Sequence, residues 1–348
     1  MHVVDVPEAS SEAILQSLRQ TGLFQYVERD HYAHTGSASE TPNDPSYLSQ
    51  WYLQKIAGPT AWTLNTGSPS VVVAVIDSGV YAHHPDLETK IVAGWSFVAS
   101  NGDTSDVYGH GTAVAGTLGA ATNNGIGVAG VSWGSLIMPL VVVDSNNYAA
   151  YSDIAAAIQY AADRGVRIMN ISVGGTDSSS ALQSAVDYAW NKGALIFASA
   201  MNASTSAPYY PAACKHVVAV SASDNNDKLA AFSNFGNWIT LAAPGTNILT
   251  TMNGGGYGYW NGTSFSSPIA AGVAALILAA NPKLTNQELL GVLTATADDI
   301  GAPGFDSSFG WGRVNAARAL AAVAPLPVTQ PHKPRQPGLE PTAFPHKP

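Results

Sequence analysis

Charged residues and cysteines are scarce in this chain of 348 residues, and basic residues are the scarcer of the two charge types. Charged residues make up 11% of the chain, with 15 Lys and Arg against 24 Asp and Glu, which gives a formal net charge of −9. Because the chain is acidic and lacks basic clusters, its composition argues against a nucleic acid as partner. The single cysteine, Cys214, has no second cysteine to pair with inside the chain. We therefore expect Cys214 to be an inert, buried thiol.

Long hydrophobic runs are also missing. The longest apolar stretch, near Ile269–Ala280, is too short to span a membrane, so the sequence predicts no membrane partner. No secretory signal is recognised at the start of the chain. Its length suits one large α/β domain with appendages, which is enough for a substantial core.

Three short segments each carry one member of a hydrolytic triad. They are Val75–Gly79, Gly109–Thr112 and Asn261–Pro268. A serine hydroxyl is a poor nucleophile until a nearby base takes its proton, and a buried carboxylate must orient that base. Ser264, His110 and Asp77 are the residue types for these three roles. Their order along the chain, Asp then His then Ser, is one of three orders known to build this geometry.

The local patterns around these residues fit a site at the edge of a sheet. Val71–Ile76 is uncharged and rich in β-branched residues, which is typical of a buried parallel strand. Asp77 would then lie at its carboxyl end, where open α/β sheets place their sites. Ile269–Ala280, stopped by an Asn-Pro pair, predicts a buried helix. Ser264 would lie near its amino terminus, where backbone N–H groups favour developing negative charge.

Further motifs extend the pattern over most of the chain. They are Trp51–Ile56, His84–Leu87, Asn123–Gly130, Ser172–Gly175, Ala243–Gly245 and Gly312–Asn315. With these motifs, residues from about 44 to 322 resemble a subtilisin-family serine protease (subtilase), closest to the thermitase-like branch. The resemblance implies a three-layer α/β fold, with a mostly parallel sheet of seven strands and helices on both faces. It also implies a secreted, monomeric serine endopeptidase.

The resemblance implies an oxyanion hole that contains Asn202. The strand expected over Ala194–Ser199 leads into this residue, so its side-chain amide can reach the site above the sheet edge. Together with the backbone N–H of Ser264, it would stabilise the tetrahedral intermediate. The alternative interpretation is an asparagine that merely caps a turn.

Two segments match those that pair with an extended peptide substrate in the family, a form of β-augmentation. They are Tyr148, Ala149 and Ala150 on one side, and Ser172, Val173 and Gly174 on the other. Gly174 would leave room for a substrate side chain in the specificity pocket. The alternatives are a plain loop for the first segment and a strand end followed by a glycine turn for the second.

Four positions depart from the family pattern. Met201 stands at the pocket wall where the family commonly has glycine, which puts a broad apolar P1 preference in doubt. Phe265 replaces the usual Met after the nucleophile, and Ala113 and Ile269 replace usual His residues. None of these positions performs proton transfer, so we expect catalysis to survive.

The resemblance also implies a structural calcium ion. Its ligands would be the side chains of Asp44, Asp86 and Asn124, with the backbone oxygens of Ala121, Ile126 and Val128. Carboxylates and carbonyls form the all-oxygen set that calcium prefers, although each Asp alone would be interpreted as a turn residue. A second calcium site of the thermitase type is not expected, because Ser96 and Ala99 stand where that site needs carboxylates. Asp103 and Asp106 are weaker candidates to supply carboxylates for such a site.

The ends of the chain are expected to flank a catalytic domain over residues 41–324. Residues 1–40 resemble the second half of an inhibitor-type propeptide, with strands over residues 2–6 and 24–30, a helix over Ser10–Gln20, and a maturation linker over residues 34–40. An ordinary amino-terminal extension is the alternative. Residues 325–348 are Pro-rich and predicted to be extended and disordered, as a linker or a dispensable tail.

Two other classes of function remain open at this stage. Gly130–Gly134 matches G-x-S-x-G, the elbow of α/β-hydrolase esterases, which would make Ser132 the nucleophile. That elbow must follow a strand and open a helix, whereas here it precedes the strand expected over Leu136–Val143. Alternatively, the same acyl-transfer machinery acts on a polyester or another ester. A catalytically silent binding protein is disfavoured, because all triad and oxyanion residues are present.

Overall fold

The computed structural model describes residues 11–22 and 40–323, and the chain divides into two units, residues 1–38 and 39–348. In the first unit, α1 (Ser11–Gln20) confirms the expected helix over the described part of its range. The two strands expected beside it, most of the maturation linker and the Pro-rich tail lie outside the described residues.

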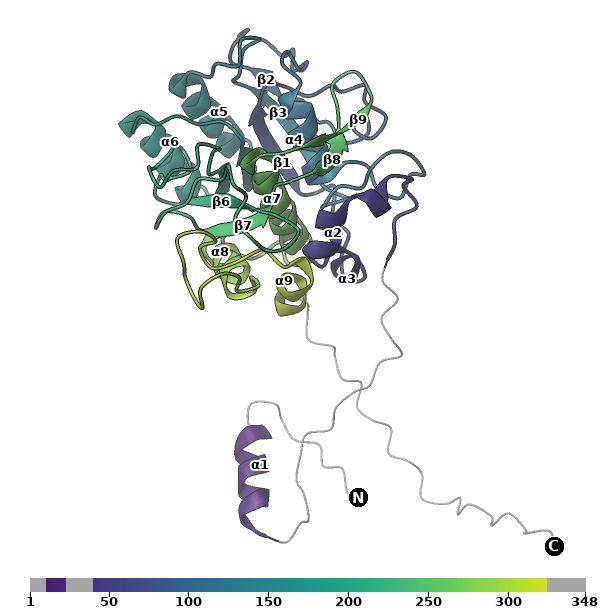
Figure 1. The fold of residues 1–348 in the computed structure, drawn as a ribbon, viewed down its shortest axis with the longest axis vertical. Helices are drawn as coiled ribbons and strands as arrows, with labels where there is room; N and C mark the ends of the chain where they lie inside the picture. The colour runs from purple at the N-terminus through teal and green to yellow at the C-terminus, as the bar shows by residue number, and fades with distance from the viewer. Residues whose placement is uncertain (1–10, 23–39, 324–348) are drawn as a thin grey trace, which may run out of the picture. The chain divides into compact units, whose positions relative to one another are not determined.

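The second unit is built on a seven-stranded parallel sheet (Figure 1), which confirms the α/β class and the strand number. The strand order is β2-β3-β1-β4-β5-β6-β7. The strands are β1 (Val72–Asp77), β2 (Trp95–Ser96), β3 (Leu136–Val141), β4 (Ile168–Ile171), β5 (Leu195–Ser199), β6 (Val217–Ser223) and β7 (Leu241–Pro244). Because all the strand pairs in this sheet are parallel, the carboxyl ends of the strands lie at one edge.

The two faces of the sheet belong to two different cores, as the alternation along β1 shows. Val73 and Val75 point into one core, while Ala74 and Ile76 point into the other. This double burial explains why β1 is apolar at every position instead of alternating with polar residues. The first core takes α2 (Trp51–Lys55), α3 (Gly58–Trp62), α4 (His110–Gly119), α7 (Thr263–Ala280), α8 (Asn286–Ala295) and α9 (Ala316–Val323). The second takes α5 (Tyr151–Asp163) and α6 (Ser180–Asn191), which lie side by side in Figure 1.

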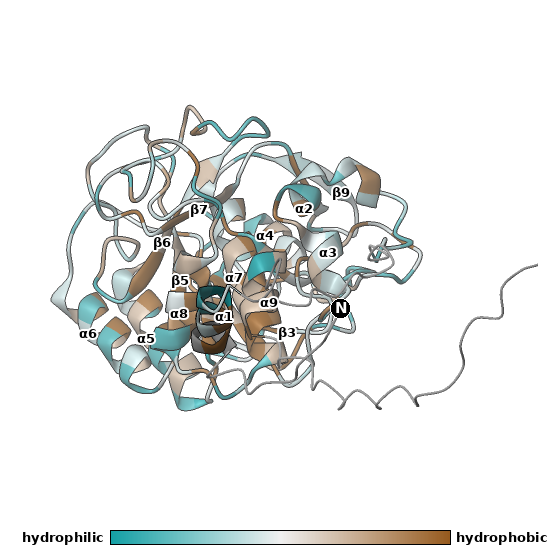
Figure 2. Cartoon of the chain, turned by 90° about the horizontal axis from the view of Figure 1, so that it is seen from below, coloured by the Kyte–Doolittle hydropathy of each residue, from teal (hydrophilic) through white to brown (hydrophobic). Residues whose placement is uncertain are grey.

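The central helix of the first core is α7. It begins six residues earlier than the helix expected from its apolar run, because Thr263–Pro268 also adopt helical backbone. By length and composition α7 could cross a membrane, but 89% of it is buried inside the fold, as suits a core helix. Figure 2 shows mixed hydrophilic and hydrophobic positions along α5 and α6, in keeping with helices that bury one face and expose the other.

Two smaller elements complete the second unit. One is the short 3-10 helix η2 (Tyr47–Ser49) that precedes α2. The other is an antiparallel hairpin of β8 (Ile248–Thr251) and β9 (Tyr257–Trp260), which leads directly into α7. No sequence pattern described above predicts either element, although the hairpin positions the segment just before Ser264.

Candidate active site

The carboxyl end of β1 carries a buried carboxylate that contacts a histidine. Asp77 is the last residue of β1 and is fully buried. Its Oδ1 accepts hydrogen bonds from the backbone N–H of Ser78 (2.8 Å) and lies 2.8 Å from Nδ1 of His110. The pairing assigns the Nδ1 proton of neutral His110 to this bond, which leaves Nε2 free to accept a proton. The structure therefore brings Asp77 and His110 together, as the sequence predicted.

His110 is the first residue of α4, and α4 approaches β1 closely at this end. A Cβ added at Gly111 would lie 2.2 Å from the carbonyl oxygen of Gly79 and 3.1 Å from Cβ of Asp77. Only glycine fits at this contact. Gly111 is therefore explained by packing, because its lack of a side chain allows the start of α4 to lie against the end of β1.

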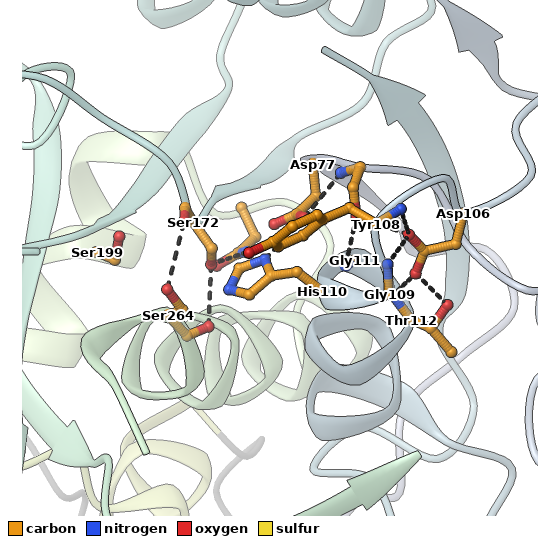
Figure 3. A network of polar contacts seen from close by, with 12 residues as sticks. Asp77, Asp106, Tyr108, Gly109, His110, Gly111, Thr112, Ser172, Ser199 and Ser264 are labelled. Atoms are coloured by element: carbon orange, nitrogen blue, oxygen red, sulfur yellow. Dashed lines mark hydrogen bonds and ion pairs between the residues drawn. The ribbon is translucent and has the colours of Figure 1, made fainter. Parts of the chain in front are cut away.

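Ser264 is the second residue of α7 and is 7% exposed. Its hydroxyl donates a hydrogen bond to the carbonyl of Ser172 (3.3 Å), and the Ser172 hydroxyl donates to the carbonyl of Ser264 (3.0 Å). Figure 3 shows the imidazole of His110 between Asp77 and Ser264. The Ser264 hydroxyl thus points to Ser172 in this state, and a rotation about its Cα–Cβ bond would redirect it. Hydrogen bonds of catalytic groups are often incomplete before substrate binds.

Asn202 lies beside the start of α7. Its Oδ1 accepts hydrogen bonds from the backbone N–H (2.9 Å) and the hydroxyl (3.0 Å) of Thr263. Because the oxygen is engaged in this way, Nδ2 is left as a donor next to Ser264. A Cβ at Gly262, whose φ is +151°, would lie 3.3 Å from that nitrogen. The glycine therefore keeps the space beside the Asn202 amide open.

His110 has a mixed electrostatic environment. Burial lowers its pKa, whereas the charge and hydrogen bond of Asp77 and the charge of Asp106 raise it, and the net displacement is upward. Two aromatic rings contact the imidazole, Phe265 at 5.9 Å and Trp260 at 6.4 Å between ring centroids. The contact of Trp260 with His110 has no local signal in the sequence, because it depends on the β8–β9 hairpin.

The two segments predicted to hold substrate follow β3 and β4, which flank β1 in the sheet. The first segment is exposed at Tyr148 (75%) and anchored by the bridge between Val143 and Ala149. The second continues from β4, and in the described part of the chain its next backbone bridge is at Gly175, with Tyr210. The side chain of Tyr151, which follows the first segment, reaches the residue after the second, because its hydroxyl would lie 2.7 Å from a Cβ placed at Gly175. The two segments frame the edge of the sheet on both sides of Asp77.

Met201 adopts a left-handed backbone (φ +71°), which is uncommon for a residue other than glycine. Its sulfur accepts a hydrogen bond from the Ser199 hydroxyl (3.5 Å) and would lie 3.5 Å from a Cβ placed at Gly174. The thioether therefore lies between the end of β5 and the second substrate segment.

Among the residues expected to bind calcium, the two carboxylates are buried and bond to the loop that carries Asn124, Ile126 and Val128. Both oxygens of Asp44 accept backbone N–H groups, from Asn123 (2.8 Å) and Asn124 (3.4 Å). The oxygens of Asp86 accept from the side chain of Asn124 (2.9 Å) and from the backbone of Val128 (2.9 Å). The Asn124 amide thus turns its nitrogen toward Asp86, and a flip of the amide plane would present its oxygen there.

The charges of these two carboxylates fit a cation. Burial raises the pKa of Asp44, backbone hydrogen bonds counteract this rise, and the nearby charge of Asp86 adds to it. Among the residues described, the ion pairs include neither carboxylate. Within the same residues, no hydrogen bond is donated to the three backbone oxygens expected as ligands, those of Ala121, Ile126 and Val128. Two buried carboxylates with unengaged carbonyls are an environment that a calcium ion would stabilise.

Asp106, the weaker candidate ligand for a second calcium site, is hydrogen-bonded to groups around His110 instead. Both of its oxygens accept hydrogen bonds from groups near His110 (Figure 3). The rival nucleophile Ser132 is fully buried, bonds to the hydroxyl of Ser135 (2.6 Å) and precedes β3, so it lacks the strand and helix of an esterase elbow. Cys214 is buried, and burial raises the pKa of its thiol to about 11, as expected for an inert group.

The fold and this cluster define an α/β serine hydrolase. The chain belongs to the subtilase family of serine proteases, since the model of that family matches residues 68–312. The chain is 40% identical over 281 residues to thermitase of Thermoactinomyces vulgaris, covering 80% of this chain and 99% of thermitase. It is 39% identical over 321 residues to the halolysin-like extracellular serine protease Nep of Natrialba magadii, covering 90% and 58% of the two chains. A solved protease structure from Pseudoalteromonas arctica superimposes with a TM-score of 0.77 at 34% identity, covering 82% of this chain and all of the other.

Proposed function

We propose that this subtilase is an endopeptidase that forms an acyl-enzyme on Ser264. His110 takes the proton of the Ser264 hydroxyl through Nε2 as the oxygen attacks the scissile carbonyl. Asp77 stays ionised, orients the ring and stabilises the imidazolium. His110 then donates the proton to the leaving amine, and a water molecule releases the acyl group by the reverse steps. The contact of 2.8 Å between Asp77 and His110 at the start of α4 carries this proposal.

The oxyanion of the tetrahedral intermediate would bind to the Asn202 amide and to the backbone N–H of Ser264. The bonds between Asn202 and Thr263 support this role, because they fix the amide before substrate arrives. Losing such an asparagine costs about 10²–10³ in turnover in a subtilisin.

The substrate would be a protein or peptide in extended conformation. It would lie between Tyr148–Ala150 and Ser172–Gly174, pairing its backbone with both segments. The exposure of Tyr148 in the first segment supports this mode, as does the place of the second segment directly after Ile171, the last paired residue of β4.

The proposed function extends to a structural calcium ion, a propeptide and the location of the enzyme. A calcium ion held by Asp44, Asp86, Asn124 and three carbonyls would stabilise the fold without entering the reaction. Residues 1–40 would act as the remnant of a propeptide removed by the enzyme itself. We also propose that the mature enzyme is an extracellular monomer, and the extracellular relative from Natrialba magadii supports the location.

Active-site labelling tests the catalytic proposal. A serine-directed phosphonate should label Ser264 in the purified enzyme, and Ser264→Ala should abolish the hydrolysis of casein. Ser132→Ala should retain labelling and activity. Labelling of Ser132, or full activity in Ser264→Ala, would overturn the proposal. An aliphatic ester assayed in parallel shows whether ester hydrolysis exceeds peptide hydrolysis.

A further inference from the structure

Asp106 lies four residues before His110, and its carboxylate receives five hydrogen bonds. Its Oδ1 accepts from the Ser78 hydroxyl (2.7 Å) and from the backbone N–H groups of Tyr108 (3.1 Å) and Gly109 (2.6 Å). Its Oδ2 accepts from the backbone N–H (2.8 Å) and the hydroxyl of Thr112. Figure 3 shows these contacts converging on one carboxylate beside the start of α4.

This arrangement replaces a missing helix cap. The residue at the N-cap of α4 is Gly109, which has no side chain to accept the free N–H groups of the first turn. Asp106 accepts the N–H of Thr112 in its place. A carboxylate at this end of a helix also interacts favourably with the helix dipole. The start of α4, and with it the backbone of His110, is therefore held by Asp106.

Ser78 connects the same carboxylate to the strand that carries Asp77. The Ser78 hydroxyl donates to Asp106 and accepts from the backbone N–H of Gly111 (2.9 Å), while the Ser78 backbone donates to Asp77. The backbone of Gly111 is thus bonded directly to the residue after Asp77, and the backbone of Gly109 is connected to it through Asp106. A small displacement of α4 relative to β1 would lengthen the contact between Asp77 and His110.

The charges that face His110 can be named element by element. Asp77 comes from β1 and Asp106 from the loop before α4, and both favour the protonated imidazole. The side chains that approach from β9 and α7 are the uncharged Trp260 and Phe265, with Ser264 nearby. Among the residues described, these two carboxylates are the only charged groups found to act on the ring.

We propose that Asp106 is a positioning residue for catalysis, which holds His110 against Asp77 and supplies a second negative charge to the imidazole. This inference rests on the proposed function, because it assigns His110 the role of base. Asp106 touches no reacting atom and acts through α4 and Ser78.

The test compares Asp106→Asn with the matched control Asp306→Asn. Asp306 also organises a loop, since it accepts the backbone N–H groups of Ala302 (3.1 Å), Ser308 (2.7 Å) and Phe309 (2.9 Å), but it lies outside the network around His110. Turnover of a peptide anilide is measured from pH 5 to 9. Thermal unfolding is measured in a Ser264→Ala background, which prevents autolysis.

We expect both variants to unfold at lower temperature, and Asp106→Asn alone to change catalysis. Its kcat should fall about tenfold or more with KM within about twofold, because small misplacements of a catalytic group are costly. Its acid midpoint for kcat should move to lower pH, because one of the charges that favour protonated His110 is lost. A kcat and a midpoint equal to those of the parent, or changes matched by Asp306→Asn, would overturn the proposal.

A second variant keeps the test decisive if Asp106→Asn does not fold. Ser78→Ala removes the bridge between Asp106 and Gly111 but retains the carboxylate. It should lower kcat without moving the acid midpoint, and an unchanged kcat would overturn the bridging role. A parent enzyme without peptidase activity, or an active Ser264→Ala, would instead contradict the proposed function itself.

Discussion

Ser264 and Ser172 exchange two hydrogen bonds, each from the hydroxyl of one residue to the backbone carbonyl of the other, at 3.3 and 3.0 Å. The Ser172 hydroxyl also accepts from the side chain of Asn170 (3.0 Å), whose oxygen accepts from the Ser267 hydroxyl (2.7 Å). All four side chains are buried. This chain of contacts ties the first turn of α7 to the end of β4, so it fixes the nucleophile relative to the proposed substrate segment.

Ser172→Ala should therefore reduce both stability and turnover. It leaves the Asn170 amide without its partner, which costs about 1–3 kcal/mol of unfolding free energy for a buried group. Thermal unfolding in a Ser264→Ala background measures this cost, and peptide hydrolysis measures kcat. Ser221→Ala is the matched control, because the buried Ser221 hydroxyl donates to the carbonyl of Ser308 (2.7 Å). If both variants lose stability and neither loses kcat, the network has no influence on the nucleophile.

Local sequence patterns predicted the elements of this site better than its contacts. The β-branched residues of β1 and the position of Asp77 directly after them placed the carboxylate at a sheet edge. The contact between Ser172 and Ser264 joins residues 92 positions apart and depends on how α7 packs against β4. No local pattern in the sequence predicts how these two elements pack.

The cap on α4 was missed for a different reason. An acidic residue shortly before a helix start is a recognised signal, and Asp106 carries it. The sequence instead suggests Asp106, together with Asp103, as a weaker alternative for a second calcium site, because Ser96 and Ala99 stand where that site needs carboxylates. Only the structure shows that the donors around Asp106 belong to its own loop, to α4 and to Ser78.

The pH dependence of activity should reflect the raised pKa of His110. Because the neutral imidazole is the base, activity is lost as pH falls through that pKa. The net upward displacement places the acid midpoint of kcat/KM above the ordinary histidine value of about 6.5. Asp77→Asn should lower this midpoint and reduce kcat on the order of 10⁴-fold, as in another serine-protease triad. An acid midpoint below the ordinary value in the parent would contradict this prediction.

Calcium removal should destabilise the enzyme. An ion that binds only the folded chain stabilises it by about 2.7 kcal/mol at a hundredfold excess over Kd. Chelation should therefore lower the unfolding temperature of Ser264→Ala and speed autolysis of the active enzyme. Asp86→Asn should weaken the response to chelator, whereas Asp224→Asn, which changes a carboxylate that organises a surface turn, should keep it. Equal melting temperatures with and without chelator would rule out the site.

Peroxide should leave turnover largely intact. Phe265, which follows the nucleophile and contacts His110, has no sulfur to oxidise and is 1% exposed. Phe265→Met should make the enzyme sensitive, because a sulfoxide there is bulky and polar. Residual activity after dilute peroxide measures the difference. Equal inactivation of the parent and Phe265→Met would show that peroxide inactivates the enzyme at another residue. Met201→Leu would then show whether that residue is Met201.

The position of Met201 predicts a preference for small side chains at P1. Ser172 is bonded to Ser264, and Asn202 is bonded to Thr263, so the segments that contain them both contact the start of α7 at the nucleophile. In the proposed mode of substrate binding, a P1 side chain would enter between these segments once the carbonyl is held at Ser264. The thioether of Met201 already lies there, between Ser199 and Gly174. We therefore expect kcat/KM to be higher for a peptide anilide with P1 Ala than for one with P1 Phe.

Met201→Gly should reverse this preference. The left-handed backbone at φ +71° suits glycine, so the variant relieves strain while it empties the space. We expect kcat/KM for P1 Phe to rise about 10-fold or more, since a few added methylene contacts in a pocket are worth 10–200-fold. Met201→Ala should give part of the rise in kcat/KM for P1 Phe, but it should not relieve the strain of the left-handed backbone. Met252→Leu, at an exposed methionine outside the two segments, should leave both substrates unchanged. A parent that prefers Phe, or a Met201→Gly variant with unaltered P1 selectivity, would show that the sulfur does not limit the pocket.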